Sequence, residues 1–193
     1  MFLDRDGVLN DLVRDPVSGA LESPLRLSDV RLVAGAAGAA RQLARAGFAL
    51  VCVSNQPAAA KGTVSVERLL AIHGRVRDLL AAEGVPLAAS RLCLHHPRGV
   101  TPGLARVCGC RKPAAGMLLD AAAALELDLR SSWMVGDTDA DVRAGRAAGC
   151  RTLLIEHPGS AHKRGSGSEP DLTAASLAGG VSELLRTQLE TFG

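Results

Sequence analysis

The sequence predicts an α/β fold in which a parallel sheet lies between two layers of helices. Short apolar runs bounded by turn residues alternate along the chain with Ala- and Leu-rich segments of helical periodicity. The chain has 193 residues, of which 47% are apolar and 22% charged, so it can build one sizeable core. We therefore expect a three-layer, Rossmann-like parallel sheet with flanking helices, in a single domain over residues 1–193.

Five apolar runs are the candidate strands, and they cover residues 2–3, 48–53, 91–94, 133–135 and 152–155. The segments between them predict helices over 35–46, 65–82, 115–125 and 139–148. Ser65 is the expected N-cap of the second helix, and Gly149 is the expected end of the fourth. The segment after His157 is rich in Gly, Ser and charge, which predicts a mobile surface loop before a last helix near 174–189.

Polar residues cluster after the predicted strands. In open parallel sheets ligands bind beyond the carboxyl ends of the strands, so these residues are expected to share one crevice. They are Asp4, Asp6, Ser54, Asn55, Arg111, Lys112, Gly136, Asp137, Thr138, Asp139 and Asp141. Acidic groups that hold a hard divalent cation, a hydroxyl and a lysine are the groups that phosphoryl transfer requires.

Asp4 and Asp6 share one side of the first strand, where they repel each other unless a positive partner is present. Acidic turns after strands are also common and solvated, so the pair alone does not establish a site. A carboxylate within about 4 Å of a phosphate meets a repulsion of about 4 kcal/mol per charge pair at an effective dielectric constant of about 20. Magnesium shared by Asp4 and Asp137 would remove that barrier, with Lys112 and Ser54 spreading the charge of the transferred group.

The segments FLDRDGVLN, VSNQ, CRKP and MVGDTDADV resemble, in order and spacing, the four motifs of the haloacid dehalogenase superfamily of phosphatases. The resemblance implies that Asp4 is a nucleophile that forms an aspartyl-phosphate. It implies that Asp6 is the general acid and then the base that activates water, with its backbone carbonyl binding Mg²⁺. It further implies that Ser54 and Lys112 stabilise the phosphoryl group and that Asp137 is a metal ligand. We expect Asn55 to bind the substrate.

The two other acids of the fourth motif have alternative roles. Asp141 either supports the metal site or occupies a helix start, where the macrodipole favours an acidic side chain. For Asp139 we expect a structural role at the same helix start.

Two closely spaced pairs of potential metal ligands fall in one loop, over residues 93–110. Cys93 and His95 are two residues apart, as are Cys108 and Cys110, which together give the four ligands of a tetrahedral structural zinc. His96 is the rival histidine, and a similar Cys-x-His and Cys-x-Cys loop in the heptose bisphosphate phosphatase subgroup favours His95. A closed zinc shell would hold the loop and take no part in catalysis. Cys52 and Cys150 are expected to be buried packing residues.

The chain has no room for a separate cap domain, so loops must select the substrate. The zinc loop delivers Arg111, which either grips a second anionic group or is solvated. The chain resembles the heptose 1,7-bisphosphate phosphatases, which remove the C7 phosphate, and also the histidinol-phosphate phosphatases. SNQPAAAKG and the longer segment 11–27 depart from the heptose pattern and leave other small sugar phosphates open. An inactive zinc-stabilised binding module is the alternative from another class.

Composition argues against several kinds of partner. Aromatic residues make up 2% of the chain and the net charge is +2, so neither stacking platforms nor a polyanion-binding field is available for nucleic acid. No apolar run reaches the roughly 20 residues that span a bilayer, and no leader segment is evident. We expect a cytoplasmic monomer that acts on a small phosphorylated sugar or similar ester and binds neither membrane nor nucleic acid, with Mg²⁺ and Zn²⁺ as cofactors.

Overall fold

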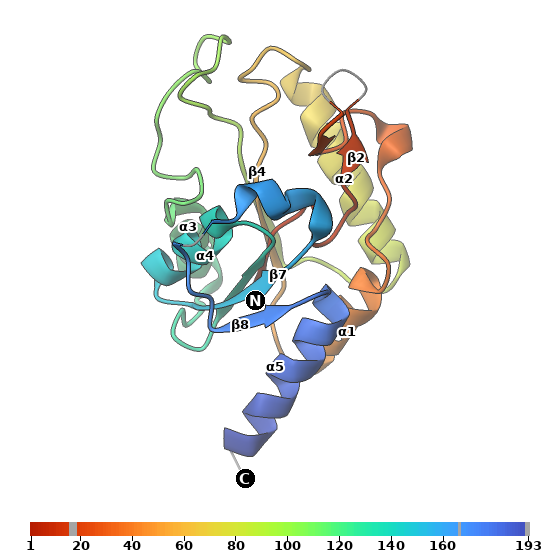
Figure 1. The fold of residues 1–193 in the computed structure, drawn as a ribbon, viewed down its shortest axis with the longest axis vertical. Helices are drawn as coiled ribbons and strands as arrows, with labels where there is room; N and C mark the ends of the chain where they lie inside the picture. The colour runs from red at the N-terminus through yellow and green to blue at the C-terminus, as the bar shows by residue number, and fades with distance from the viewer. Residues whose placement is uncertain (16–18, 166, 192–193) are drawn as a thin grey trace.

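The computed structural model describes residues 1–15, 19–165 and 167–191. Its main sheet has six parallel strands in the order β5-β4-β1-β6-β7-β8 (Figure 1). The strands are β1 (Phe2–Leu3), β4 (Val51–Asn55), β5 (Ala89–Cys93), β6 (Trp133–Gly136), β7 (Arg151–Ile155) and β8 (Leu172–Ala174). The predicted parallel sheet is confirmed. Residues 16–18 of the segment 11–27, residue 166 of the segment after His157 and the last two residues of the predicted domain lie outside the described part.

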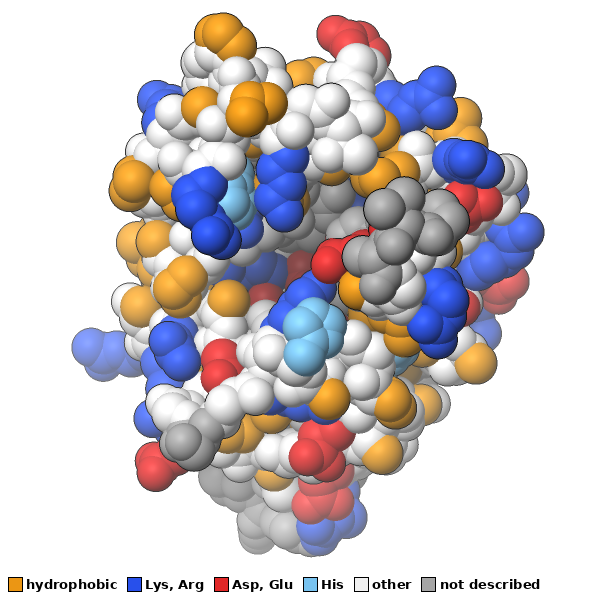
Figure 2. Space-filling model, turned by 45° about the horizontal axis from the view of Figure 1, so that its top comes forward, with side chains coloured by type: hydrophobic (Ala, Val, Ile, Leu, Met, Phe, Trp, Pro, Cys, Tyr) orange, Lys and Arg blue, Asp and Glu red, His pale blue; other side chains and the backbone are white. Residues whose placement is uncertain are grey.

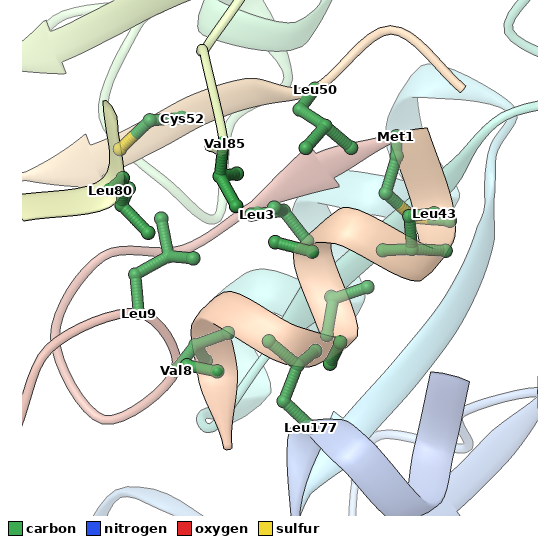
Figure 3. Close-up of a cluster of buried hydrophobic side chains, with 14 of the residues drawn as sticks. Met1, Leu3, Val8, Leu9, Leu43, Leu50, Cys52, Leu80, Val85 and Leu177 are labelled. Carbon is green, nitrogen blue, oxygen red and sulfur yellow. The ribbon is translucent and has the colours of Figure 1, made fainter. Parts of the chain in front are cut away.

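Helices cover both faces of the sheet, as the three-layer prediction requires. On one face lie α1 (Ala36–Arg45), α2 (Val66–Ala82) and α5 (Leu177–Thr191), and on the other lie α3 (Gly116–Leu125) and α4 (Asp139–Ala148). Figure 3 shows the core between the sheet and the face that carries α1, α2 and α5. Leu3 of β1 lies there in one cluster with Leu43 of α1 and Leu177 of α5. Full burial of each such leucine stabilises the fold by about 1.5–3 kcal/mol.

The predicted helix boundaries hold within a few residues. Ser65 is the N-cap of α2, since its side chain accepts a hydrogen bond from the Arg68 N–H at 3.2 Å. Gly149 follows α4 with a positive φ of 83°, a conformation in which glycine carries no steric cost. The predicted strand 48–53 is instead β4 over Val51–Asn55, because the Phe48 N–H closes the end of α1 by donating to the Leu43 carbonyl. Ser54 and Asn55 therefore belong to the strand itself.

Five short elements were not predicted. β2 (Val13–Arg14) and β3 (Leu21–Glu22) pair as an antiparallel hairpin. The segment after His157, expected to be a mobile loop, contains the 3₁₀ helix η2 (Pro158–Lys163) and the edge strand β8. A second 3₁₀ helix, η1 (Leu27–Asp29), precedes α1. Each spans only two to six residues, which is too short for an apolar periodicity to mark it.

Within the part of the chain that the structure describes, none of the helices combines the length and apolar character that a membrane span requires.

Candidate active site

The carboxyl ends of the central strands open into a cavity of about 360 Å³. β1 lies between β4 and β6, so the strand order reverses at β1, which is where open α/β sheets bind ligands. All the predicted catalytic and substrate-contacting residues line this cavity: Asp4, Asp6, Ser54, Asn55, Arg111, Lys112 and Asp137. Figure 2 shows a hollowed face around which both acidic and basic side chains gather.

Three buried aspartates form an acidic cluster at the base of the cavity. Asp4, Asp137 and Asp141 each place one carboxylate oxygen within 4.8 Å of the others. Burial, partly offset by Lys112, raises the pKa of Asp4 to about 6. Burial and the charges of Asp4 and Asp141 raise the pKa of Asp137 to about 7. Three buried oxygen donors with excess negative charge fit a hard cation such as Mg²⁺.

Two glycines allow these acids to lie so close to the backbone. Gly7 has a φ of 82°, and a Cβ there would overlap the Asp137 carboxylate. A Cβ at Gly136 would overlap the Asp141 side chain in the same way. The turn after Asp6 is therefore glycine for two reasons, its positive φ and the close approach of Asp137.

The Lys112 ammonium contacts two members of the acidic cluster and one backbone carbonyl. Its Nζ lies 2.7 Å from Asp4 Oδ1, 2.6 Å from Asp141 Oδ1 and 2.7 Å from the Val53 carbonyl oxygen. Burial alone would lower the pKa of Lys112, but the two carboxylates outweigh it and raise the pKa above its usual value. The ammonium therefore stays charged and fixes the orientation of Asp4.

Asp141 occupies the helix start and also lies in the acidic cluster, and its support of a metal site stays a prediction. Its Oδ2 accepts hydrogen bonds from the Thr138 N–H at 3.0 Å and the Thr138 hydroxyl at 2.6 Å, at the start of α4. Its Oδ1 faces Lys112 in the acidic cluster. Asp139 has the structural role expected, but as an anchor for a loop, since it accepts hydrogen bonds from the Gly165 N–H and the Ser168 hydroxyl.

Asp6 lines the cavity but lies outside the acidic cluster, and its positive partner is Arg5. The Arg5 guanidinium, with 0% exposure, contacts both Asp6 oxygens at 3.0 Å. Further donors are Asn10 Nδ2 at 3.0 Å, Ser23 Oγ at 2.9 Å and Gln56 Nε2 at 2.6 Å. Burial would raise the pKa of Asp6, but Arg5 and these hydrogen bonds outweigh it and lower the pKa. The positive partner expected for the Asp4 and Asp6 pair is thus, for Asp6, the Arg5 guanidinium.

The end of β4 supplies two polar side chains with different attachments. The Ser54 hydroxyl, which is buried, accepts from Gln56 Nε2 at 3.0 Å. The Asn55 amide makes two hydrogen bonds to the Lys112 backbone: Nδ2 donates to its carbonyl at 2.9 Å, and Oδ1 accepts from its N–H at 3.0 Å. Asn55 therefore fixes the backbone of Lys112, and its predicted contact with the substrate stays a prediction.

The structure brings together the four predicted zinc ligands Cys93, His95, Cys108 and Cys110. The three sulfur atoms are 3.2–3.6 Å apart, and His95 Nδ1 lies 3.4 Å from Cys110 Sγ and 3.8 Å from Cys93 Sγ. Ligands at about 2.3 Å in a tetrahedron around zinc are roughly 3.7 Å apart, so this spacing suits one tetrahedral ion. His96 stands aside, with its Nδ1 accepting from the Arg98 N–H at 3.1 Å.

The loop over residues 93–110, which carries these four side chains, docks on the segment after β4. The N–H groups of Val100 and Thr101 donate to the Ala60 carbonyl at 2.7 and 3.1 Å, and the Thr101 hydroxyl donates to the Ala59 carbonyl at 2.6 Å. This contact places Lys61 and Arg111 on one wall of the cavity. No carboxylate among the described residues forms an ion pair with either of them.

Sequence reasoning missed several residues of the site. Gln56 ends the second motif, VSNQ, but the sequence alone indicated no role for it. Lys61, Glu22, Ser23 and Lys163 also line the cavity. The last three reach it through the hairpin and η2, elements that no pattern in the sequence marks.

Comparisons with known proteins agree with this geometry. The family model described as HAD-hydrolase-like matches residues 109–179. A D-glycero-beta-D-manno-heptose-1,7-bisphosphate 7-phosphatase of Yersinia pestis is 36% identical over 159 residues, which cover 82% of this chain and 80% of that protein. The D-glycero-D-manno-heptose-1,7-bisphosphate 7-phosphatase of Thermosynechococcus vestitus is 40% identical over 189 residues, 94% of this chain and 92% of that protein.

Solved structures show the same fold. A D,D-heptose 1,7-bisphosphate phosphatase from B. bronchiseptica, complexed with magnesium and phosphate, superposes with a TM-score of 0.79 at 29% identity, covering 97% of this chain and 98% of that one. A protein from Mesorhizobium loti that is described as a HAD-like phosphatase gives a TM-score of 0.77 at 32% identity, covering 96% of this chain and 85% of that one.

Proposed function

The chain belongs to the haloacid dehalogenase superfamily and is a phosphatase, and from this premise we propose that it removes the C7 phosphate of D-glycero-D-manno-heptose 1,7-bisphosphate. The observation that supports this choice of substrate is the basic wall of the cavity, which is made by Lys61 and Arg111. We propose that the reaction passes through a phosphoryl ester on Asp4.

In this proposal Asp4 attacks the phosphorus, and its orientation comes from the 2.7 Å contact with Lys112. Asp6 protonates the departing sugar oxygen and later takes a proton from the attacking water. Its cage of donors holds it as a carboxylate, so it must take up a proton and leave part of that cage when substrate is bound. The Ser54 hydroxyl, which accepts from Gln56, points its own proton toward the transferred group.

The acidic cluster fits Mg²⁺, with Asp4, Asp137 and the Asp6 backbone carbonyl as the proposed ligands and Asp141 beside them. When bound, the ion neutralises negative charge between the carboxylates and the phosphate. A related solved phosphatase is described as complexed with magnesium and phosphate, which supports this assignment. Asp137 is held from behind, because Ser160 Oγ and Arg164 Nη1 donate to its carbonyl oxygen at 3.2 and 3.1 Å.

We propose that Cys93, His95, Cys108 and Cys110 hold a structural zinc. All four positions of a tetrahedral ion would be filled by protein, so the ion fixes the loop and leaves no place for substrate. The loop end then carries Arg111 to the cavity, where its Nη1 donates to the His95 carbonyl at 3.2 Å.

The charge of the basic wall favours a bisphosphate over histidinol phosphate, the alternative substrate. Burial lowers the pKa of His96, and the positive charges of Arg111, Lys61 and Arg98 lower it further. A second phosphate would be attracted there, whereas the ammonium group of histidinol phosphate would be repelled. The binding-module alternative has no support, because the relatives are phosphatases and the acidic cluster is intact.

A substrate panel tests the proposal. The purified protein with Mg²⁺ is assayed for phosphate release from heptose 1,7-bisphosphate, histidinol phosphate and p-nitrophenyl phosphate. We expect the largest kcat/KM for the bisphosphate, by about tenfold or more, with the 1-phosphate as product. A larger kcat/KM for histidinol phosphate would replace the proposed substrate with the alternative.

A further inference from the structure

Glu22 and Lys163 form an ion pair at the mouth of the cavity. Its two charges cancel each other, whereas the charges of the basic wall are both positive. Lys163 Nζ lies 3.4 Å from Glu22 Oε2, and both side chains line the cavity. Their exposed fractions are 37% and 52%, so the pair is solvated and its charges are accessible to a ligand.

The segments that carry this pair are attached to the catalytic residues. Lys163 ends η2, and η2 is fastened to the Asp137 carbonyl by Ser160 and Arg164. Glu22 ends β3, and the next residue, Ser23, donates to Asp6 Oδ2 at 2.9 Å. The hairpin and η2 also touch, since a Cβ at Gly159 would lie 2.7 Å from Leu21 Cδ1. The two charges therefore have a defined place relative to the reacting centre.

Glu22 is the carboxylate of the cavity that belongs to neither buried network. Asp4, Asp137 and Asp141 share the acidic cluster with Lys112, and Asp6 is bound by Arg5. Without Lys163, Glu22 would present a single negative charge to the substrate at the mouth. Such a charge attracts an ammonium group, which phosphorylated amino compounds carry and sugar phosphates lack.

We propose that Lys163 is a specificity-determining residue: by neutralising Glu22 at the cavity mouth, it prevents the phosphatase from binding phosphate esters that carry an ammonium group. This inference rests on the proposed phosphatase chemistry but not on the heptose ester. The lysine acts by rejecting a class of substrate, while the basic wall acts by attracting another.

Two simple probes test it. O-phosphoethanolamine carries an ammonium group, and p-nitrophenyl phosphate does not. We expect Lys163→Gln to raise the ratio of kcat/KM for phosphoethanolamine over that for p-nitrophenyl phosphate by about fivefold, through KM. Glu22→Gln should not raise the ratio, and the double variant should return it to the wild-type value. The rise should shrink in high salt, which screens exposed charges.

Arg41→Gln is the matched control. Arg41 pairs with Glu83 at 3.2 Å, with exposed fractions of 37% and 56%, and it does not line the cavity. Arg41→Gln removes one positive charge, as Lys163→Gln does, but away from the substrate. An unchanged ratio in Lys163→Gln, an equal rise in Arg41→Gln, or a rise that persists in the double variant would overturn the inference. The two proposals can fail separately. If the ratio of kcat/KM values rises in Lys163→Gln but the wild-type protein does not hydrolyse heptose bisphosphate, the proposed substrate is wrong and this inference stands.

Discussion

The acidic cluster and the zinc loop are two sets of candidate metal ligands built in opposite ways. The acidic cluster lies at the ends of β1 and β6, where Asp4 and Asp137 are 8% and 2% exposed, and its surplus charge is balanced only in part by Lys112. The loop over residues 93–110 gathers sulfur and nitrogen ligands: Cys93 ends β5, and the other three lie on a long connection outside the strands and helices. The sheet positions the carboxylates of the acidic cluster, whereas the cysteine and histidine ligands must themselves order the loop that carries them.

This difference teaches which contacts each region depends on. Loss of a carboxylate should abolish chemistry and leave the sheet intact, because the strands hold their own backbone. Loss of a thiol should loosen the loop and, through Arg111, weaken substrate selection. Four experiments separate these effects.

The largest effect is expected at the nucleophile. Asp4→Asn keeps the shape of the side chain but removes the attacking carboxylate, so kcat should fall by about 10⁴-fold or more. The measurement is phosphate release from p-nitrophenyl phosphate with Mg²⁺, with zinc content measured by atomic absorption as the control. Activity within tenfold of wild type would exclude Asp4 as the nucleophile.

A large effect on stability is expected at the zinc loop. Cys108→Ser should lose the bound zinc and lower the Tm by at least about 5 °C, because metal binding contributes directly to the order of the loop. The kcat for p-nitrophenyl phosphate should change much less than in Asp4→Asn. Cys150→Ala, a change to a buried thiol outside the cluster, is the control and should keep its zinc. Full zinc content in Cys108→Ser would contradict the assignment.

Arg111 links the two regions, and its loss should have an intermediate effect. Arg111→Ala removes a charge that faces no carboxylate among the described residues, so KM for a sugar bisphosphate should rise by about tenfold. KM for p-nitrophenyl phosphate, which has one phosphate, should change by no more than about twofold. Equal losses on both substrates would mean that Arg111 does not bind a second anion.

The smallest effect concerns pH and the acidic cluster. The pKa values of Asp4 and Asp137 are raised from 3.8 to about 6 and about 7, so the folded protein without metal binds more protons than the unfolded chain. Its stability should therefore fall as the pH rises from 3.8 towards about 7. Because Mg²⁺ competes with these protons, the ion should raise the Tm more at neutral pH than at mildly acidic pH.

Thermal unfolding in EDTA and in MgCl₂ measures this difference at the two pH values. Asp137→Asn, which removes one of the titrating groups, should reduce it. An equal gain in Tm at both pH values would show that the acidic cluster is not where Mg²⁺ binds.

The sequence was sufficient to predict five of the six strands and the clustering of Asp4 with Asp137 and of the four cysteine and histidine residues, because strand-end residues and closely spaced cysteines follow directly from chain order. Asp4 and Asp137 are 133 residues apart by position, yet adjacent parallel strands bring them together. The cage around Asp6 could not be predicted in the same way. Ser23 donates to Asp6 only because a hairpin of two-residue strands brings it there. Gln56 donates to Asp6 only when β4 has its final register in the sheet. Such contacts depend on packing, for which local pattern carries no signal.

The segment after His157 shows the same limit. Its polar composition suggested a mobile loop, but Ser160 and Arg164 use that polarity to bind the Asp137 carbonyl. Polar composition predicts exposure to solvent only when no buried backbone group is available as a partner.

The paired hydrogen bonds between Asn55 and the Lys112 backbone have a further consequence. Arg111 sits between this fixed point and Cys110, which belongs to the zinc loop, so its backbone is held on both sides. Only the rotamers of the guanidinium stem remain to vary its reach. If Asp4 and Arg111 act as proposed, the distance between the attacked phosphate and the second anion would vary little, and a substrate would be selected by the spacing between its two charged ends.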